Sequence, residues 1–332
     1  MAQRPKPKAP RPLGASPAAA IAEAIRQAQR LLVCIHKHPD GDALGSAIAA
    51  VLALEAMGKQ VVGYCPGPLL VHFHDIPGIE RLRPQFPSGQ PFDLALYLDC
   101  ADLDRVLKDF KPPCRTVNID HHKSNALFAD LNWVDPAAAA TGELLYALFV
   151  EMQVEITAPL AQALYLAIMT DTGSFRYANT RPETFEIVAR LVQRGADPAL
   201  AARLYWDNVS PHSVRLRAAA LQSLTLEAGG RLAWAQLTAA QFAAHGGLEH
   251  APEGLSSALR GIRGVEVGLL FTEIPGEGIR VSLRSHGNVD VSEIARQLGG
   301  GGHRSAAGAV IEAPLDEARQ RTLAVLRRAL AP

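Results

Sequence analysis

The chain has 332 residues, a length that accommodates two packed domains. Hydrophobic residues make up 48% and charged residues 20% of it, which is typical of a globular protein and excludes disorder over most of its length. Its 33 basic residues balance 33 acidic ones, which argues against binding to long DNA or RNA, because such binding depends on a basic surface.

Residues 1–17 form a basic, proline-rich tail that we expect to be disordered. The tail lacks the apolar core that a signal peptide needs. No apolar run in the sequence is long enough to span a bilayer. The four cysteines are not spaced like a disulfide framework or a zinc knuckle. The sequence therefore predicts a cytoplasmic protein with reduced thiols and no membrane contact.

The first half of the chain alternates apolar runs with helical patterns. A helix is predicted from Pro17 to about Arg30, followed by a strand at 31–35 that is buried on both faces. A polar loop then leads into an Ala/Leu-rich helix that ends at Gly58, and a second strand is predicted at 60–64. This order is a βαβ unit and implies a parallel sheet.

Two further strands are predicted at 94–98 and 116–119, each followed by an acidic residue, Asp99 or Asp120. Ligand sites of open α/β sheets lie at the carboxyl ends of their strands, so these positions are informative. Helices are predicted at about 141–152, at 159–170 and between Thr180 and Gly195.

The pattern changes in the last third of the chain. A linker is predicted at 196–228, with a connecting helix at about 211–227. The elements predicted beyond it are strands at 231–237, 265–274 and 278–285, a helix at 291–298, a glycine cluster and a final helix from Leu315. We therefore predict an α/β protein with a parallel-sheet domain at 18–195 and a smaller α/β domain at 229–332.

Four segments carry candidate metal ligands. The loop 36–42 offers His36, Asp40 and Asp42, and its Pro39 and Gly41 allow it to fold tightly. The other three segments offer Asp99, His121 and Asp171. Taken alone, Asp99 and Asp171 are typical of a turn or a helix end, but together the four segments supply two imidazoles and four carboxylates.

This ligand set suits Mn²⁺, with Mg²⁺ as the alternative, better than structural zinc, because it contains oxygen and nitrogen but no thiolate. Two cations require one bridging carboxylate, and Asp99 is the candidate because it stands alone at a rigid strand end. Two cations about 3.5–4 Å apart can clamp the attacking and leaving oxygens of a phosphoryl displacement. The sequence therefore predicts a two-metal phosphoesterase.

The glycine-rich segment GGGGHRSAAG, residues 299–308, is a candidate phosphate-binding element. Its glycines Gly301 and Gly302 allow backbone N–H groups to approach a phosphate, and His303 and Arg304 add donors. The alternative is a flexible loop before a strand. Further candidate substrate residues, each equally compatible with a structural role, are Arg284 and Ser285 at a strand end and Arg176 after Asp171.

Taken together, the sequence resembles the DHH phosphoesterases: His36, Asp40–Gly–Asp42, Asp99, Asp120–His121–His122 and Asp171 follow that family's pattern. The glycine-rich segment resembles the DHH-associated substrate domain of nanoRNases of the NrnA type, RecJ and cyclic-dinucleotide phosphodiesterases. The resemblance covers essentially everything after the tail. It implies a catalytic DHH domain and a substrate-binding domain that face each other across a cleft.

The resemblance also implies roles for the site residues. One cation would be bound by His36, Asp40 and Asp99, and the other by Asp42, Asp99, His121 and Asp171. His122 would act in catalysis, contacting the scissile phosphate or helping to protonate the leaving oxygen. The second domain would grip the nucleotide end of the substrate.

The activity implied is hydrolysis of dinucleotides and slightly longer oligonucleotides to mononucleotides, with removal of the 3′-phosphate from adenosine 3′,5′-bisphosphate as a second activity. A cyclic- or linear-di-AMP phosphodiesterase shares the same catalytic residues and is an alternative. A RecJ-like exonuclease would need a longer chain and a basic single-strand channel. A manganese pyrophosphatase lacks the glycine-rich motif, and a non-catalytic nucleotide sensor would be expected to have lost ligands. The sequence leaves a homodimer open.

Overall fold

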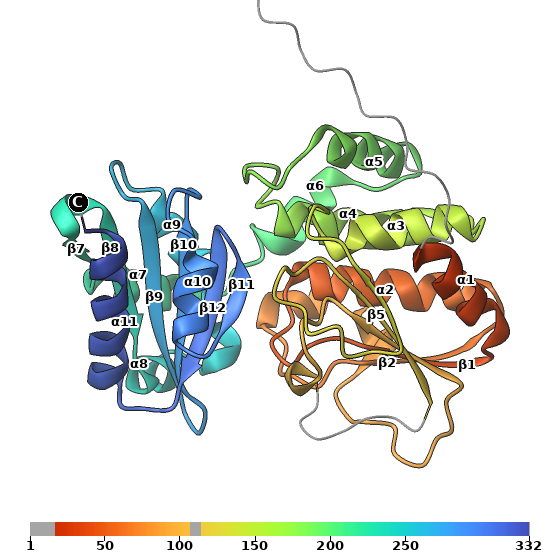
Figure 1. The fold of residues 1–332 in the computed structure, drawn as a ribbon, viewed down its shortest axis with the longest axis horizontal. Helices are drawn as coiled ribbons and strands as arrows, with labels where there is room; N and C mark the ends of the chain where they lie inside the picture. The colour runs from red at the N-terminus through yellow and green to blue at the C-terminus, as the bar shows by residue number, and fades with distance from the viewer. Residues whose placement is uncertain (1–16, 107–113, 332) are drawn as a thin grey trace, which may run out of the picture.

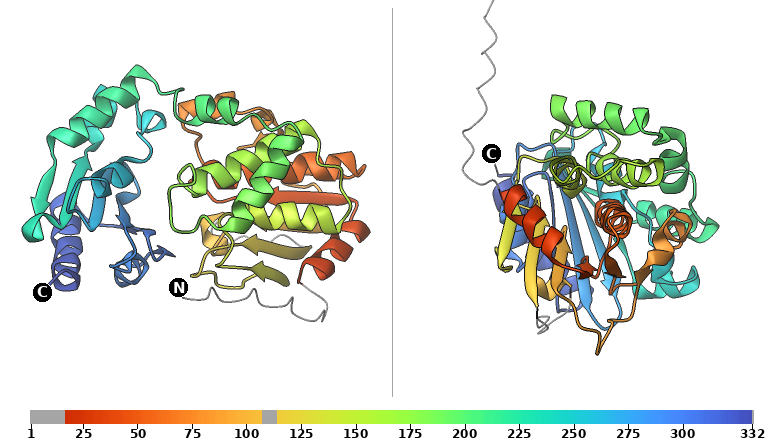
Figure 2. Two further views of the ribbon diagram at one scale, coloured as in Figure 1. Left: turned by 90° about the horizontal axis from the view of Figure 1, so that it is seen from above. Right: turned by 90° about the vertical axis from the view of Figure 1, so that its right-hand side faces the viewer.

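The structure is a computed structural model that describes residues 17–106 and 114–331. The tail predicted to be disordered therefore lies outside the described residues, apart from Pro17. The described residues form two lobes, each built around its own sheet (Figure 1). Figure 2 shows the same two lobes side by side from above. In the described part of the chain, no helix combines the length and the apolar character that crossing a membrane requires.

The first lobe contains a six-stranded parallel sheet in the order β3-β2-β1-β4-β5-β6. Its strands are β1 (Arg30–Cys34), β2 (Gln60–Tyr64), β3 (Leu82–Arg83), β4 (Leu94–Leu98), β5 (Arg115–Asp120) and β6 (Leu131–Val134). Side chains of β1 alternate between two cores: Leu31 and Val33 pack on the helix side, and Leu32 and Cys34 pack on the other. The predictions of a parallel sheet and of a first strand buried on both faces are confirmed.

Helices cover one face of this sheet, and loops cover much of the other (Figure 1). The helices of the first lobe are α1 (Pro17–Gln27), α2 (Gly41–Ala56), α3 (Thr141–Glu151), α4 (Ala158–Asp171), α5 (Pro182–Gln193) and α6 (Pro198–Tyr205), with 3₁₀ turns η1 (Val71–Asp75), η2 (Ile79–Arg81) and η3 (Leu103–Arg105). Helix α2 is buried almost all round, which explains its uniformly apolar sequence. It packs tightly on α4 because Gly45 has no side chain: a Cβ there would lie 2.6 Å from the Ala163 carbonyl oxygen.

The second lobe contains a mixed sheet in the order β11-β12-β10-β9-β8-β7, in which β8 and β9 are parallel and the other neighbours antiparallel. Its strands are β7 (Thr225–Glu227), β8 (Leu232–Leu237), β9 (Val267–Ile274), β10 (Gly278–Ser285), β11 (Gly301–His303) and β12 (Ala306–Ile311). Its helices are α7 (Pro211–Gln222), α8 (Ala239–Ala244), α9 (Leu255–Arg260), α10 (Val291–Gln297) and α11 (Leu315–Ala329), with 3₁₀ turns η4 (Ala228–Gly230) and η5 (Leu248–His250).

One local prediction for this half was wrong. The predicted helix 211–227 ends at Gln222, and residues 225–227 instead form β7, which pairs with β8. The glycine-rich segment is not a loop alone, because Gly301–His303 form β11 at the edge of the sheet that faces the first lobe (Figure 1). β12 lies so close to this segment that two of its glycines leave no room for a side chain. A Cβ on Gly300 would lie 2.1 Å from the Gly308 carbonyl oxygen, and one on Gly302 would lie 2.6 Å from the Ala306 carbonyl oxygen.

Candidate metal centre and substrate cleft

Six predicted ligands from separate segments lie together at the carboxyl edge of the parallel sheet. They form two groups in which the ligand atoms lie within 4.8 Å of one another: His36, Asp40 and Asp99 in one, and Asp42, His121 and Asp171 in the other. The convergence follows from the topology, because β1, β4 and β5 are adjacent parallel strands that end at the same edge.

Asp99 lies between the two groups. Its Oδ2 is 3.4 Å from His36 Nε2, and its Oδ1 is 3.5 Å from His121 Nε2. The buried hydroxyl of Thr141 donates a hydrogen bond of 3.0 Å to Oδ1. The backbone of Asp99 has φ 57°, a left-handed conformation that costs free energy at a non-glycine residue and is often found at functional sites. One carboxylate oxygen thus faces each ligand group.

The start of α2 fixes the orientation of Asp40 and Asp42. Asp40 is the N-cap of the helix and accepts a hydrogen bond from the backbone N–H of Ala43. Asp42 is buried and accepts from the backbone N–H groups of Thr141 and Gly142, at 2.7 and 3.1 Å, and from the hydroxyl of Ser46. Both carboxylates are therefore oriented by hydrogen bonds from protein groups.

Gly41 was expected to let the loop 36–42 fold tightly, but in the structure its lack of a side chain permits close packing of α2 against the end of α4. It is the first residue of α2, and a Cβ there would lie 2.4 Å from Thr170 Cγ2 at the end of α4. Since Thr170 immediately precedes Asp171, this close approach brings two ligand-bearing segments together.

His121 presents one ring nitrogen to the carboxylates. Its Nδ1 donates a hydrogen bond to the Ala138 carbonyl oxygen at 3.2 Å. Its Nε2 therefore points at Asp42 and Asp171, at 3.6 Å from an oxygen of each. A backbone acceptor on one nitrogen is the usual way in which a metal-binding histidine is oriented.

Burial and neighbouring charges shift the pKa values of these candidate ligands strongly. Burial raises the pKa of Asp171 to about 6 and that of Asp42 well above its usual range, and the neighbouring Asp99 adds to both effects. Burial alone would lower the pKa of His121, yet the charges of Asp171 and Asp42 raise it to about 10. Buried carboxylates this close repel one another, and divalent cations would relieve that repulsion.

The donor chemistry also fits divalent cations. The two groups offer carboxylate oxygens and imidazole nitrogens, which suit Mn²⁺ and Mg²⁺, and they contain no thiolate. His36 directs its Nε2 at Asp99 Oδ2 from 3.4 Å, so this nitrogen is the one placed to bind a cation. The residues present therefore fit a metal centre.

Asp120 contributes a contact to which the sequence analysis assigned no role. Its Oδ1 accepts a hydrogen bond of 2.7 Å from His122 Nδ1, and its Oδ2 accepts one of 2.6 Å from Asn125. Burial alone would lower the pKa of His122, but the charge and hydrogen bond of Asp120 raise it. Asp120 thus orients His122, a role that the position of this acid two residues before the histidine does not reveal by itself.

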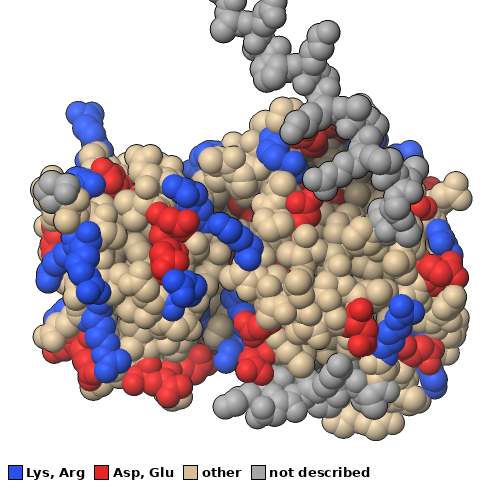
Figure 3. Space-filling view, in the orientation of Figure 1, with Lys and Arg blue, Asp and Glu red and all other residues tan. Residues whose placement is uncertain are grey.

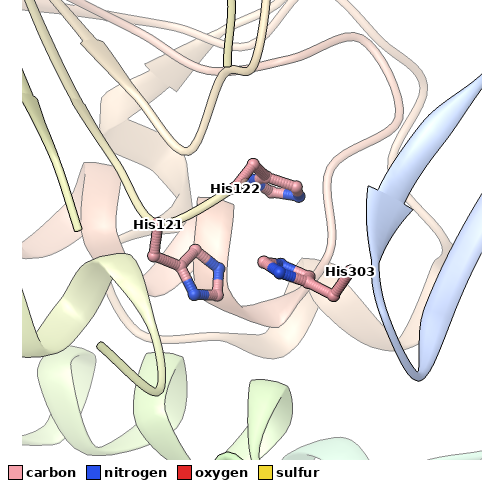
Figure 4. Close-up of side chains that lie close together, drawn as sticks. All are labelled: His121, His122 and His303. Atoms are coloured by element: carbon pink, nitrogen blue, oxygen red, sulfur yellow. The ribbon is translucent and has the colours of Figure 1, made fainter. Parts of the chain in front are cut away.

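His303 from the second lobe reaches this first-lobe cluster. Figure 4 shows its ring pointing between His121 and His122 from the opposite side. It stacks on His122 with ring centroids 4.6 Å apart and lies 4.7 Å from His121. His303 Nε2 is buried without a hydrogen-bond partner among the described residues, so it can bind a ligand.

A cleft of about 590 Å³ separates the two lobes at this point. Its lining includes Asp40, His121 and Asp171 from one lobe and His303 and Arg284 from the other. The space-filling view shows the hollow between the lobes, with basic side chains inside it (Figure 3). A volume of this size matches a small ligand rather than a long strand.

Contacts between the lobes border the cleft. The hydroxyls of Tyr177 and Ser257 are 2.9 Å apart, and the guanidinium of Arg260 stacks 4.9 Å from the centre of the Tyr177 ring. His72 Nε2 lies 3.3 Å from Glu253 Oε2. These contacts could not be predicted from the sequence, because each joins positions far apart in the chain.

The structure brings only part of the predicted substrate set to the cleft. Arg284 and Arg304 line it, although Arg304 is largely exposed and lies 3.6 Å from Asp290. Ser285 is fully buried, and its hydroxyl donates to the Val289 carbonyl oxygen. Arg176 is exposed and lies over the ring of Trp206, 5.7 Å from its centre.

The two glycines of β11, Gly301 and Gly302, face different parts of the structure. A Cβ on Gly301 would lie 3.2 Å from Ser124 Oγ, so this glycine permits close approach of the two lobes. Gly302 has φ 138° and faces β12 instead.

Comparisons with known proteins agree with this architecture. Residues 30–168 match the DHH family, N-terminal domain, and residues 249–331 match the DHHA1 domain. The chain is 34% identical over 313 residues to the bifunctional oligoribonuclease and PAP phosphatase NrnA of Thermus thermophilus, covering 93% of each chain. It is 28% identical over 297 residues to the protein of the same name from Bacillus subtilis, covering 84% of this chain and 89% of that one. The crystal structure of an exopolyphosphatase-related protein from Bacteroides fragilis superposes with a TM-score of 0.82 at 25% identity, covering 95% of both chains.

Proposed function

The chain belongs to the DHH family, and we propose that it is a Mn²⁺-dependent phosphoesterase that cleaves dinucleotides and slightly longer oligonucleotides to mononucleotides. We further propose that it removes the 3′-phosphate of adenosine 3′,5′-bisphosphate, since its relatives are named for both activities. The observation that carries the proposal is the convergence of six candidate ligands, Asp99 among them, next to His122, on which His303 of the second lobe stacks.

We assign the residues of the first lobe to cation binding. His36, Asp40 and Asp99 would hold one cation, and Asp42, Asp99, His121 and Asp171 the other. When bound, such cations polarise water and neutralise charge on phosphate oxygens. The separate orientation of the two Asp99 oxygens supports its role as the shared ligand.

His122 and His303 act on the substrate. The hydrogen bond from His122 Nδ1 to Asp120 fixes the ring, and Nε2 is then free to contact the scissile phosphate or deliver a proton to the leaving oxygen. His303 binds the phosphate from the other side of the cleft, and Arg284 adds a charged donor beside it. Enclosure between two lobes favours short substrates.

A substrate panel tests the proposal. Purified protein with Mn²⁺ is offered a dinucleotide, a longer oligonucleotide, adenosine 3′,5′-bisphosphate, cyclic di-AMP and pyrophosphate. We expect the dinucleotide and the bisphosphate to be hydrolysed fastest. A rate that increases with strand length, or one confined to cyclic di-AMP or pyrophosphate, would contradict the proposal.

An Asp99→Ala variant provides the mechanistic control. It should lose hydrolysis of every substrate, because both cation sites share this carboxylate. Asp316→Ala, at an exposed position on α11, should keep wild-type rates. Near wild-type turnover by the Asp99 variant would remove the two-metal assignment.

A further inference from the structure

Arg280 lines the cleft between the lobes, and it is neither a proposed cation ligand nor one of the residues proposed to bind the scissile phosphate. Side chains alternate along β10, so that Ile279, Val281 and Leu283 pack into the core beneath α10 and α11. The intervening residues Arg280, Ser282 and Arg284 line the cleft. Arg280 therefore presents its guanidinium on the same surface as Arg284.

The guanidinium of Arg280 reaches across to the metal-binding loop. Its Nη2 lies 2.8 Å from His38 Nδ1, two residues before Asp40. Arginine has only donors, so this contact requires an unprotonated Nδ1, which is a neutral acceptor. Among the described residues, no carboxylate oxygen lies within 4.0 Å of the Arg280 guanidinium.

Charges of both signs surround this guanidinium. Arg105 is a basic neighbour of both Arg280 and His38, and Lys37 is a basic neighbour of His38. Glu277 is the acidic neighbour, but its Oε2 points at His38 Nε2 from 3.5 Å, and its side chain is 42% exposed. A partly buried charge without an anionic partner is unfavourable, and a phosphate would supply that partner.

Arg280 lies apart from the residues assigned to the cleaved phosphate. Across the sheet, His303 pairs with Ala306 and Ala306 pairs with Arg284, so these three lie at one level. Arg280 is four residues further along β10, about 13 Å away. It therefore meets a different part of the substrate from His303.

We propose that Arg280 binds the 5′-phosphate of the nucleotide whose 3′ oxygen carries the scissile phosphate. This inference rests on the proposed function. A 5′-phosphorylated dinucleotide and adenosine 3′,5′-bisphosphate share that unit, a ribose with a phosphate on each side. His38 orients the guanidinium, and Arg280 selects substrates that carry the second phosphate.

Paired substrates test the assignment. The pairs are pApA against ApA, and adenosine 3′,5′-bisphosphate against adenosine 3′-monophosphate. The wild-type enzyme should prefer the 5′-phosphorylated member of each pair in kcat/KM. Arg280→Ala should lower kcat/KM for that member by about 10- to 100-fold and leave the other member unchanged, because a charge-assisted hydrogen bond to phosphate is lost.

Two further variants sharpen the test. Arg280→Lys retains the charge without the forked donors and should retain part of the preference, which also covers the case in which the alanine variant does not fold. Arg296→Ala, which removes an exposed arginine paired with Glu293, should keep the full preference.

An equal loss for both members of a pair in the Arg280 variants would overturn the inference, since it would show a contact between lobes only. A wild-type enzyme without a preference would overturn it as well. Failure of the wild-type enzyme on all four substrates would instead count against the proposed function.

Discussion

A Thr141→Val variant tests whether the Thr141 hydroxyl holds the Asp99 carboxylate in the orientation that cation binding requires. Thr141 is fully buried, and its hydroxyl donates a hydrogen bond of 3.0 Å to Asp99 Oδ1. Valine has nearly the same shape, and the backbone N–H of residue 141 can still donate to Asp42. The substitution therefore removes one hydrogen bond to the shared carboxylate and leaves every proposed ligand in place.

The size of the effect follows from that hydrogen bond. A hydrogen bond to a charged group contributes about 1.5–3 kcal/mol. When this hydrogen-bond free energy is lost from the cation-bound protein, Mn²⁺ affinity should drop by about 10- to 100-fold. This is the range usual for residues that orient metal ligands. We expect activity to recover at higher Mn²⁺ concentration. Calorimetric titration with Mn²⁺ and activity measured against Mn²⁺ concentration both report this shift.

The control is Thr322→Val, which removes another buried threonine hydroxyl, in α11 and remote from the cleft. It should leave Mn²⁺ affinity unchanged. Thermal unfolding of the cation-free variants measures any separate loss of stability. Wild-type Mn²⁺ affinity in the Thr141 variant would refute the argument that this hydroxyl holds Asp99 in place.

Three other substitutions address different parts of the structure. Asp120→Asn should lower turnover by about 10- to 100-fold while cation content on elemental analysis stays normal, because Asp120 orients His122; loss of cations would make Asp120 a ligand instead. His303→Ala should raise KM and lower kcat without changing cation content, and a protein that loses cations would contradict its assignment to substrate. Gly45→Ala should reduce the free energy of unfolding by about 1–3 kcal/mol in urea denaturation, because the new methyl group meets the Ala163 carbonyl oxygen; unchanged stability would show that α2 and α4 can move apart.

The convergence of the candidate metal ligands could be predicted because it depends on topology. Apolar runs identified β1, β4 and β5, and a βαβ unit implied that they are parallel. Parallel strands end at one edge, so polar residues directly after them must gather there. The role of Asp120 could not be obtained in this way, because spacing does not show whether a carboxylate faces a cation or a neighbouring histidine.

For the candidate substrate residues, the sequence contained a signal that the prediction did not use. Arg284 and Ser285 were predicted together, yet consecutive side chains of a strand point to opposite faces. Applied to the strand predicted at 278–285, that alternation separates Ser285 from the cleft and groups Arg280 with Arg284.

The short strands of the second lobe were harder to predict. β12 begins Ala–Ala–Gly, residues with little intrinsic strand preference. It becomes a strand because it pairs with β10 on one side and β11 on the other, and Gly308 permits this: a Cβ there would lie 2.9 Å from the Val281 carbonyl oxygen. Such pairing is set by the whole sheet and not by the local sequence.

The proposed cation ligands and the proposed substrate-binding residues lie in different lobes, so their roles can be tested separately. All six proposed cation ligands belong to the first lobe, whereas His303, Arg284 and Arg280 belong to the second. Cation affinity should therefore respond to Thr141 and not to His303, while substrate preference should respond to Arg280 without a change in cation content. Since His303 stacks directly on His122, we expect a substrate phosphate held by the second lobe to reach the proposed metal centre only when the lobes are together. We therefore predict that catalysis by this chain requires both lobes, with cations bound by the first and substrate by the second.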